Sequence, residues 1–385
     1  MSRMNLVSKL HHPLVIEKIT QTNWTHTNTL PLVVEFDPTS ACDLACPGCI
    51  SGELLNKERF SRDRVLSLTK EMIDAGVRAV ILIGGGEPLT HPAIAGVLQL
   101  LGEAGVQIGI TTNGTLIDRH IDLIAKYASW TRVSVDSATP ETFQHLRPSR
   151  TGQSRFDEVI RNMKLLAGRK SGILGYSFLI RTAADGNNEH VAGGEFGFGR
   201  IQQTNVHEIF EAAKLARDIG CDYFEPKPSY DDNHYLIIHD SDAMAIARDQ
   251  IAMAKELETD TFHIIESVNL RHSIEGRQME PQPKSYTSCP STQLRTLVTP
   301  SGVYVCPYFR GNDTKKIGDV TTSSFLDMWT STHRSEVMGR LNPCTDCGMH
   351  CIRHETNLEL FSIRQLLAAG APVTTVNSDD PDLFI

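Results

Sequence analysis

Three cysteines, Cys42, Cys46 and Cys49, form the group of residues in this chain with the clearest chemistry. Their C-x3-C-x2-C spacing places three thiolates in one short loop, directly after an apolar segment at residues 32–36. Because a cubane iron–sulfur cluster has four irons, three protein ligands leave one iron open to a substrate or cofactor. Thiolate ligation with an open position is typical of a cluster that performs chemistry, so this loop predicts a catalytic metal centre.

A structural zinc ion is the alternative occupant of this loop. Structural zinc sites have four ligands, so zinc would need a further donor, for example His91. The order of strand-like and helix-like segments and a nearby glycine-rich segment favour the catalytic cluster.

That glycine-rich segment is Gly84-Gly85-Gly86-Glu87-Pro88, after the second predicted strand. Consecutive glycines let a ligand approach the backbone, because no Cβ stands in the way. The carboxylate of Glu87 would suit an ammonium group. A plain tight turn also explains the segment when it is taken alone.

The composition limits the class of protein. The chain has 385 residues, with 46 acidic against 37 basic residues, and no Lys/Arg cluster predicts a nucleic-acid partner. No apolar stretch approaches the ~20 residues of a membrane span, and His11-His12-Pro13 stands where a signal peptide needs an apolar run. We therefore expect a cytoplasmic protein without a membrane partner, whose nine cysteines serve metal or redox chemistry.

From residue 32 onward, strand-like and helix-like segments alternate, which predicts a parallel sheet with right-handed crossovers. We expect a partial barrel or a doubly wound sheet, with functional residues after the strands. The expected strands are Leu32–Asp37, Ala79–Ile83, Gln107–Thr111, Trp130–Val135, Ile173–Ile180 and Asp222–Glu225. The expected helices lie near residues 61–75, 92–104, 118–127, 154–168 and 205–219.

The cysteine loop and Gly85-Gly86-Glu87 together resemble the radical S-adenosylmethionine superfamily. The resemblance implies an α/β fold with a partial (β/α)6 TIM-like barrel. It also implies a [4Fe–4S] cluster on the three cysteines, bound S-adenosylmethionine, and a reducing partner such as flavodoxin or ferredoxin. In that family, reductive cleavage of S-adenosylmethionine yields a 5′-deoxyadenosyl radical that abstracts a hydrogen from the substrate.

The resemblance further implies residues that bind the cofactor. By position they are Gly85, Gly86 and Glu87 at the methionine amine, Asn113 after the third strand, Ser134 and Asp136 near the ribose, and Arg181 near the methionine carboxylate. Ser134 and Asp136 are equally explained as turn-forming residues.

A second cysteine group lies between residues 289 and 351 and resembles a SPASM/twitch extension, which holds an auxiliary [4Fe–4S] cluster. The ligands implied are Cys289, Cys306, Cys344 and Cys347, with Gly302 in a hairpin before Cys306. The spacing from Gly302 to Cys306 is one residue shorter than the usual family form. A zinc ribbon is the alternative, since four cysteines also suit zinc. Cys351 is not needed for a four-ligand cluster. It could replace another ligand, donate a hydrogen near the substrate, or be inert.

These segments predict four parts: an N-terminal extension (1–31), the barrel (32–270), an auxiliary-cluster domain (271–360), and a C-terminal helix with a polar tail (361–385). The glycine-rich segment 182–204 is expected to be either a disordered segment or a lid over the site, and its place after the fifth strand favours a lid. On position alone, its candidate functional residues are Glu189, His190 and Glu195. Cys221, at the start of the sixth strand, is expected to be a small buried hydrophobe.

Glu225 and Lys227 end the sixth strand and are candidates to orient the substrate or act as general base, although solvated charges at a strand end explain them equally. We expect an enzyme acting on a small polar metabolite such as a sugar or aminocyclitol. The grounds are the single auxiliary cluster that the resemblance implies and the 31 residues before the barrel, too few for a peptide-recognition domain. The alternatives are a maturase that modifies a peptide or protein, and a non-catalytic metal-binding scaffold.

Overall fold

The computed structural model describes residues 5–24, 29–182, 204–230, 241–275, 283–349, 351–376 and 382–385. The predicted lid, including Glu189, His190 and Glu195, lies outside the described residues apart from its two ends.

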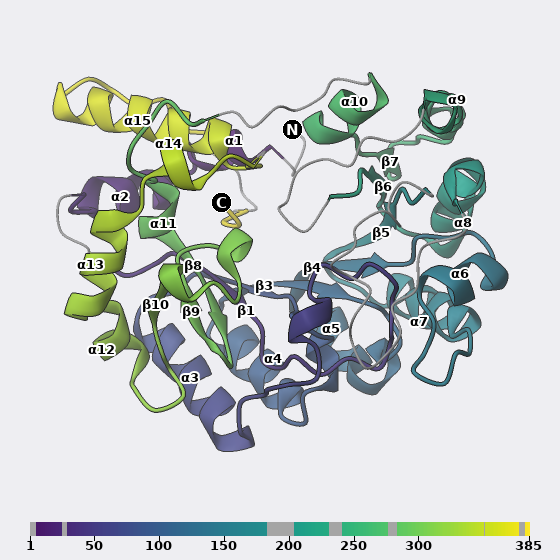
Figure 1. The fold of residues 1–385 in the computed structure, drawn as a ribbon, viewed down its shortest axis with the longest axis horizontal. Coiled ribbons are helices and arrows are strands. Elements are labelled where there is room, and N and C mark those ends of the chain that lie inside the picture. The colour runs from purple at the N-terminus through teal and green to yellow at the C-terminus, as the bar shows by residue number, and fades with distance from the viewer. Residues whose placement is uncertain are drawn as a thin grey trace.

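One mixed sheet forms the centre of the described structure, with strands in the order β10-β9-β8-β1-β2-β3-β4-β5-β6-β7 (Figure 1). Strands β1 to β7 are parallel and pair consecutively. The strands are β1 (Val33–Phe36), β2 (Ala79–Leu82), β3 (Gln107–Thr112), β4 (Ala128–Ser134), β5 (Ile173–Leu179), β6 (Tyr223–Lys227), β7 (His263–Ile264), β8 (Arg295–Thr299), β9 (Gly302–Tyr304) and β10 (Lys316–Gly318).

The helices that follow these strands cover the outer side of the curved sheet (Figure 1). The helices of the described chain are α1 (Leu6–Lys9), α2 (Pro13–Gln21), α3 (Arg62–Asp74), α4 (Ile94–Glu103), α5 (Ile121–Tyr127), α6 (Pro140–Leu146), α7 (Phe156–Ala167), α8 (Ile209–Ile219), α9 (Ser241–Lys255), α10 (Val268–Ile274), α11 (Ser291–Leu294), α12 (Phe325–Trp329), α13 (Thr332–Arg340), α14 (Pro343–Asp346) and α15 (His354–Ala368). All six predicted strands and all five predicted helices are confirmed, and the fold is a partial (β/α)6 barrel.

Alternation along each strand separates the barrel wall into two faces. On β1, Val34 and Phe36 join the main hydrophobic core, whereas Glu35 lines a cavity on the other side. On β4, Val133 joins the core and Arg132 lines the same cavity. The polar side chains of the barrel therefore face inward.

The C-terminal region continues the barrel sheet. Strand β8 pairs in parallel with β1, with Glu35 opposite Leu297, and β9 returns antiparallel to β8. The predicted hairpin is confirmed, since Gly302 follows its turn with φ of 148°. The hairpin that leads to Cys306 is thereby joined directly to β1, the first strand of the barrel.

Both ends of the described chain pack together in a second core that includes Leu10, Val15 and Leu360. The prediction of a polar tail is wrong for Leu383 and Phe384, which are buried there together with Ile385. These apolar residues follow an acidic stretch, so the sequence pattern concealed their burial. No helix among the described residues has the length and apolar character needed to cross a membrane.

Candidate functional site

The loop between β1 and α3 carries Cys42, Cys46 and Cys49, all half-buried. Burial raises the pKa of the Cys46 thiol to about 12, and it raises the pKa of the Cys42 and Cys49 thiols as well. Buried thiols ionise only when a metal or cation stabilises the thiolate. Three such donors in one loop fit a metal cluster. His91 is committed elsewhere, because its Nε2 lies 2.9 Å from the Phe60 carbonyl oxygen and its Nδ1 accepts from the Ala93 amide.

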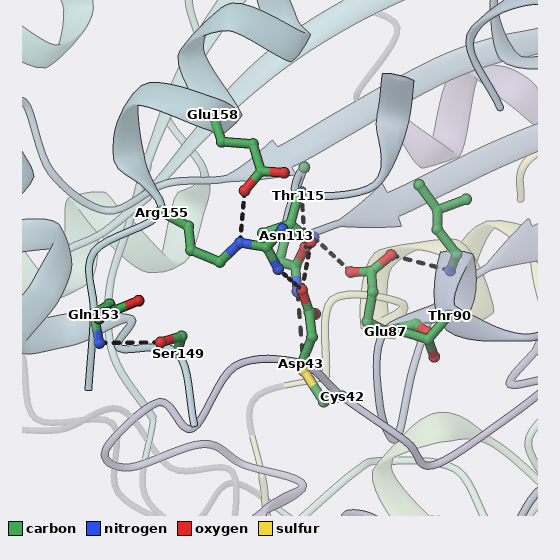
Figure 2. A network of polar contacts seen from close by, with 12 residues as sticks. Cys42, Asp43, Glu87, Thr90, Asn113, Thr115, Ser149, Gln153, Arg155 and Glu158 are labelled. Atoms are coloured by element: carbon green, nitrogen blue, oxygen red, sulfur yellow. Dashed lines mark hydrogen bonds and ion pairs between the residues drawn. The ribbon is translucent and has the colours of Figure 1, made fainter. Parts of the chain in front are cut away.

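Asp43, inside this loop, is the anchor that holds it to the barrel (Figure 2). Asn113 donates to Asp43 Oδ1 over 2.8 Å, and Thr115 donates to Oδ2 over 2.7 Å. Arg155 Nη1 forms an ion pair with Oδ2 at 2.5 Å and is itself held by Glu158. The side chain of the predicted cofactor residue Asn113 is therefore engaged in supporting the cysteine loop.

The glycine-rich segment packs directly on the cysteine loop. The Glu87 amide donates to the Ala41 carbonyl over 2.8 Å. A Cβ on Gly86 would lie 2.3 Å from that same oxygen, so only glycine fits there. A Cβ on Gly85 would meet nothing closer than 3.6 Å.

The carboxylate of Glu87 is buried and accepts three hydrogen bonds. They come from the Leu89 amide, the Thr112 hydroxyl at 2.7 Å and the Asn113 amide at 2.7 Å. Figure 2 shows Glu87 beside Asn113. Burial raises the pKa of Glu87 to about 7, against the effect of these donors. Glu87 thus joins the glycine-rich segment to the loop after β3.

Asp136 and Arg147 form a buried ion pair beside the cysteines. Asp136 has a φ of 61°, accepts from Arg147 Nε over 2.7 Å, and accepts from the Leu179 amide over 2.7 Å. Arg147 Nη1 lies 4.0 Å from Cys46 Sγ. Despite burial, the Asp136 and Cys46 charges hold the pKa of Arg147 above its ordinary value. The guanidinium therefore places a positive charge next to the predicted cluster.

Two other predicted cofactor residues lie on the neighbouring strands. Ser134 ends β4, half-buried and opposite Ser177 of β5. Arg181 follows β5, and its Nη2 donates to the Pro47 carbonyl over 3.4 Å. The structure therefore brings Arg181 onto the cysteine loop itself.

Arg310, close behind Cys306, connects the C-terminal region to the glycine-rich segment. Its Nε donates to Asp37 Oδ2 over 2.7 Å, and the same oxygen accepts from the Gly85 amide over 2.9 Å. Asp37 directly follows β1 and is buried. One carboxylate thus ties together the cysteine loop's strand, the glycine-rich segment and the C-terminal region.

The second cysteine group surrounds a small cavity between α11, the segment that follows β9, and α15. Four thiols line it, those of Cys289, Cys306, Cys347 and Cys351. Cys344, by contrast, is exposed and is absent from that lining. Within the described ranges, no three His, Cys, Asp or Glu side chains are placed to hold a single metal ion. The thiols instead lie around a central space, and in a cubane each would bind a different iron.

A larger, partly open cavity of about 640 Å³ lies inside the barrel. Its lining includes Glu35, Thr111, Arg132, Tyr308 and Arg353. Tyr308 and Arg353 also line the cavity of the second cysteine group, so the two cavities share a wall.

The predicted residues of β6 lie at the edge of this interior. Glu225 is buried, with Oε2 3.4 Å from Arg132 Nη1. Burial lowers the pKa of Lys227 to about 8, and the nearby Arg132 charge acts in the same direction. Cys221 is buried, as expected of a small hydrophobe.

The sequence reasoning missed several charged residues that the fold brings to these sites. They are Glu35, Asp37, Asp43, Arg132, Arg147, Arg155, Arg310 and Arg353. Asp37 and Asp43 had a usable signal, since one ends a strand and the other lies between two cysteines. The arginines had no such signal, because each acts on a partner far away in the chain.

Comparisons with known proteins agree with this geometry. Residues 36–189 match the family model described as the Radical SAM superfamily. An AdoMet-dependent heme synthase from Methanosarcina barkeri is 24% identical over 49% of this chain and 48% of its own length. A GTP 3′,8-cyclase from Synechocystis is 29% identical over 46% of this chain and 48% of its own length. The chain thus spans about half the length of these curated relatives.

Solved structures share the fold over more of the chain. Streptococcus suis SuiB bound to precursor peptide SuiA superposes with a TM-score of 0.56 and 16% identity, over 80% of this chain and 66% of that one. The enzyme named anSMEcpe, with bound AdoMet and a peptide, gives 0.56 and 14% identity, over 88% of this chain and 98% of that one. At these identities the likeness concerns the fold alone.

Proposed function

The chain belongs to the radical S-adenosylmethionine superfamily, and from that premise we propose that it is an enzyme that abstracts hydrogen from a small polar metabolite. When bound, a [4Fe–4S] cluster and S-adenosylmethionine supply the chemistry, a reductive cleavage that yields a 5′-deoxyadenosyl radical. The observation that carries this proposal is the loop of three half-buried thiols, packed against the glycine-rich segment through Ala41.

In this proposal, Cys42, Cys46 and Cys49 hold the cluster, and Asp43 keeps their loop in place. The backbone of Gly85 and Gly86 forms the surface for the methionine amine. Glu87 keeps this surface in position, because its carboxylate is already occupied by three donors.

The remaining polar residues of the wall have complementary tasks in this proposal. Arg181 supplies positive charge for the methionine carboxylate, while Ser134 and Asp136 form the wall beside the ribose. Asp136 also orients Arg147 beside Cys46, which favours the thiolate.

We assign an auxiliary cluster to the second cysteine group, with Cys289, Cys306, Cys347 and Cys351 as ligands. The support is the common cavity that these four thiols line, and the exposure of Cys344. The sequence-based ligand set is thereby revised, with Cys351 in place of Cys344. A structural zinc ion remains the competing occupant and is distinguished by metal analysis.

A small substrate is favoured by the partly open cavity of about 640 Å³, a size typical of small-molecule sites. The sequence relatives carry names of small-molecule chemistry, a heme synthase and GTP cyclases. The peptide-bound neighbours support only a shared fold, so peptide modification is the second candidate. Glu225 and Lys227 lie outside the residues that line the cavity, and Glu225 contacts it through Arg132; in this proposal the two residues orient the substrate or move a proton from that position. The reducing partner is a flavodoxin or ferredoxin.

The proposal is tested by anaerobic reconstitution, iron and sulfide analysis, and assay of 5′-deoxyadenosine after reduction. About eight irons per chain are expected from two clusters, with 5′-deoxyadenosine formed in their presence. Cys42→Ala should abolish that product. Intact 5′-deoxyadenosine formation by Cys42→Ala, or none by the loaded wild-type protein, would refute the proposal. About four irons with bound zinc would make the second centre structural.

A further inference from the structure

Two arginines in the barrel cavity carry buried N–H groups without acceptors. They are Arg132 on β4 and Arg353 just before α15, and in the described structure the Nε of each is buried and unbonded. Both side chains line the cavity of about 640 Å³. A buried donor without an acceptor is costly, and here two such donors belong to side chains that line one cavity.

The carboxylates near these two arginines satisfy them only weakly. Arg132 Nη1 lies 3.4 Å from Glu225 Oε2, and Arg353 Nη2 lies 3.4 Å from Glu35 Oε1. Ionic hydrogen bonds of this kind are ordinarily about 2.7–2.9 Å. Arg310, for comparison, is 2.7 Å from Asp37. The two cavity arginines therefore retain donors for a further partner.

The charge balance of the interior also favours an anion. Arg132 and Lys227 lie near Glu225, and both Arg353 and Arg295 contact Glu35. Among these six described groups, four are basic and two are acidic. Of these six groups, Arg132, Arg353 and Glu35 line the cavity itself and the other three lie behind its wall. The remaining charged side chains of the lining are paired, Lys9 with Asp382 and Arg310 with Asp37. An anion between Arg132 and Arg353 would offset the surplus in a low-dielectric space.

We propose that the substrate carries a carboxylate or phosphate group, which Arg132 and Arg353 bind inside the barrel. This inference rests on the proposed function, because it takes the cavity as the substrate site. A guanidinium offers a planar fork of donors that matches the oxygens of either group. The proposed anion site narrows the expected substrate from any polar metabolite to an acidic one. It disfavours a cationic aminocyclitol without an acidic group.

The position of the two arginines suits this role. Arg132 lies two residues before Ser134 on the same face of β4, roughly 7 Å deeper in the barrel. Arg353 follows Cys351 by two residues, and its amide donates to Cys351 Sγ over 3.4 Å. The bound anion would hold the substrate between the predicted cofactor and the second cysteine group.

The experiment measures binding by calorimetry to the full, reconstituted protein. The probes are glucose, glucuronate, glucose 6-phosphate and inorganic pyrophosphate, so that carboxylate and phosphate are compared with a neutral sugar. At least one acidic probe should bind, and glucose should not. Arg132→Gln and Arg353→Gln should each weaken binding about 10-fold or more, the effect of losing charged hydrogen bonds. Glu225→Gln should strengthen binding of the acidic probe, because the substitution removes the carboxylate that lies near Arg132.

Arg169→Gln is the matched control, since Arg169 is exposed and pairs with an exposed Asp122, and it should leave binding unchanged. Arg132→Lys keeps the positive charge but lacks the planar fork of donors, so it should bind the acidic probe weakly. If its melting temperature equals that of the wild type, the weaker binding reports lost recognition and not misfolding. Binding of glucose as tight as that of the acidic sugars, absence of binding by every acidic probe, or unchanged binding in both glutamine variants would overturn the inference. Formation of 5′-deoxyadenosine is assayed separately, so failure here is distinguishable from failure of the proposed function.

Discussion

At the scale of single residues, the adjacent glycines Gly85 and Gly86 have different surroundings. A Cβ on Gly86 would lie 2.3 Å from the Ala41 carbonyl oxygen, one residue before Cys42. On Gly85 the nearest contact would be 3.6 Å, which is ordinary packing. We therefore expect opposite results from substitution of alanine at these two positions.

Gly86→Ala should displace the cysteine loop, because the backbone at Ala41 cannot move without shifting Cys42. We expect loss of about half the iron and of 5′-deoxyadenosine formation, measured after reconstitution. Gly85→Ala is the matched control and should retain both. Equal iron content in the two variants would contradict the contact described here.

Cys344 and Cys351 form a second comparison at this scale. Cys351 lines the common cavity of the four thiols, while Cys344 is exposed. Cys351→Ala should lower the iron content by about four per chain, the content of one cluster, whereas Cys344→Ala should leave it unchanged. The opposite result would restore Cys344 as a ligand.

At the scale of elements, the strand ends determine which charges meet. Asp37 follows β1 and joins the Gly85 amide to Arg310, so the C-terminal region braces the glycine-rich segment. Strand β6 ends in Lys227, beside Glu225 and near Arg132. Burial of this strand end makes the charge of Lys227 costly.

Lys227 should therefore give the protein a pH-dependent stability. Its pKa is about 8 in the folded protein, against 10.5 ordinarily, so between these values the unfolded chain binds more protons and stability rises with pH. Below about pH 8 the folded protein bears the full cost of the buried charge. Lys227→Met should accordingly be more stable than wild type at pH 7, with an advantage that shrinks between pH 8 and 10.5.

Chemical unfolding across this pH range measures the effect. Lys214→Met serves as the control, because the Lys214 side chain on α8 is 48% exposed. Its difference in free energy of unfolding from the wild type should stay constant across this pH range. If the free energies of unfolding of the wild type and Lys227→Met changed with pH in parallel, the prediction would be wrong and the Lys227 ammonium would be well solvated.

At the scale of the whole molecule, two cores support one barrel. The main core lies between the sheet and its outer helices, and the second joins α2, α15 and Leu383–Ile385 near the starts of the strands. Phe384 packs edge-on against Trp130 of β4, with ring centroids 5.4 Å apart, and both line the barrel cavity. The C-terminal residues thus form part of the wall of the cavity.

Phe384→Ala should destabilise the protein by about 3 kcal/mol, the usual cost of deleting a buried aromatic ring. Its side chain is 5% exposed, so little of that cost is relieved by solvent. Urea unfolding of the wild type and the variant measures the difference. Leu366→Ala, at a residue 39% exposed on α15, should change the free energy of unfolding by no more than about 0.5 kcal/mol.

The amino-acid sequence by itself determined the cysteine loop, the glycine-rich segment and the six strand–helix units. These features are local: thiol spacing within Cys42–Cys49 and the periodicity of each strand and helix are properties of neighbouring residues. The hairpin at Gly302 belongs to the same class, because a turn is specified by a few adjacent positions.

Only the tertiary structure decided which side chains meet. Cys351 joins Cys289 at one cavity across a separation of 62 positions, and Arg353 reaches Glu35 across 318. Such contacts depend on how β8 docks against β1, and they leave no periodic trace in the chain. The buried Leu383 and the unbonded Nε atoms of Arg132 and Arg353 were hidden for the same reason, since burial is a property of the assembled fold.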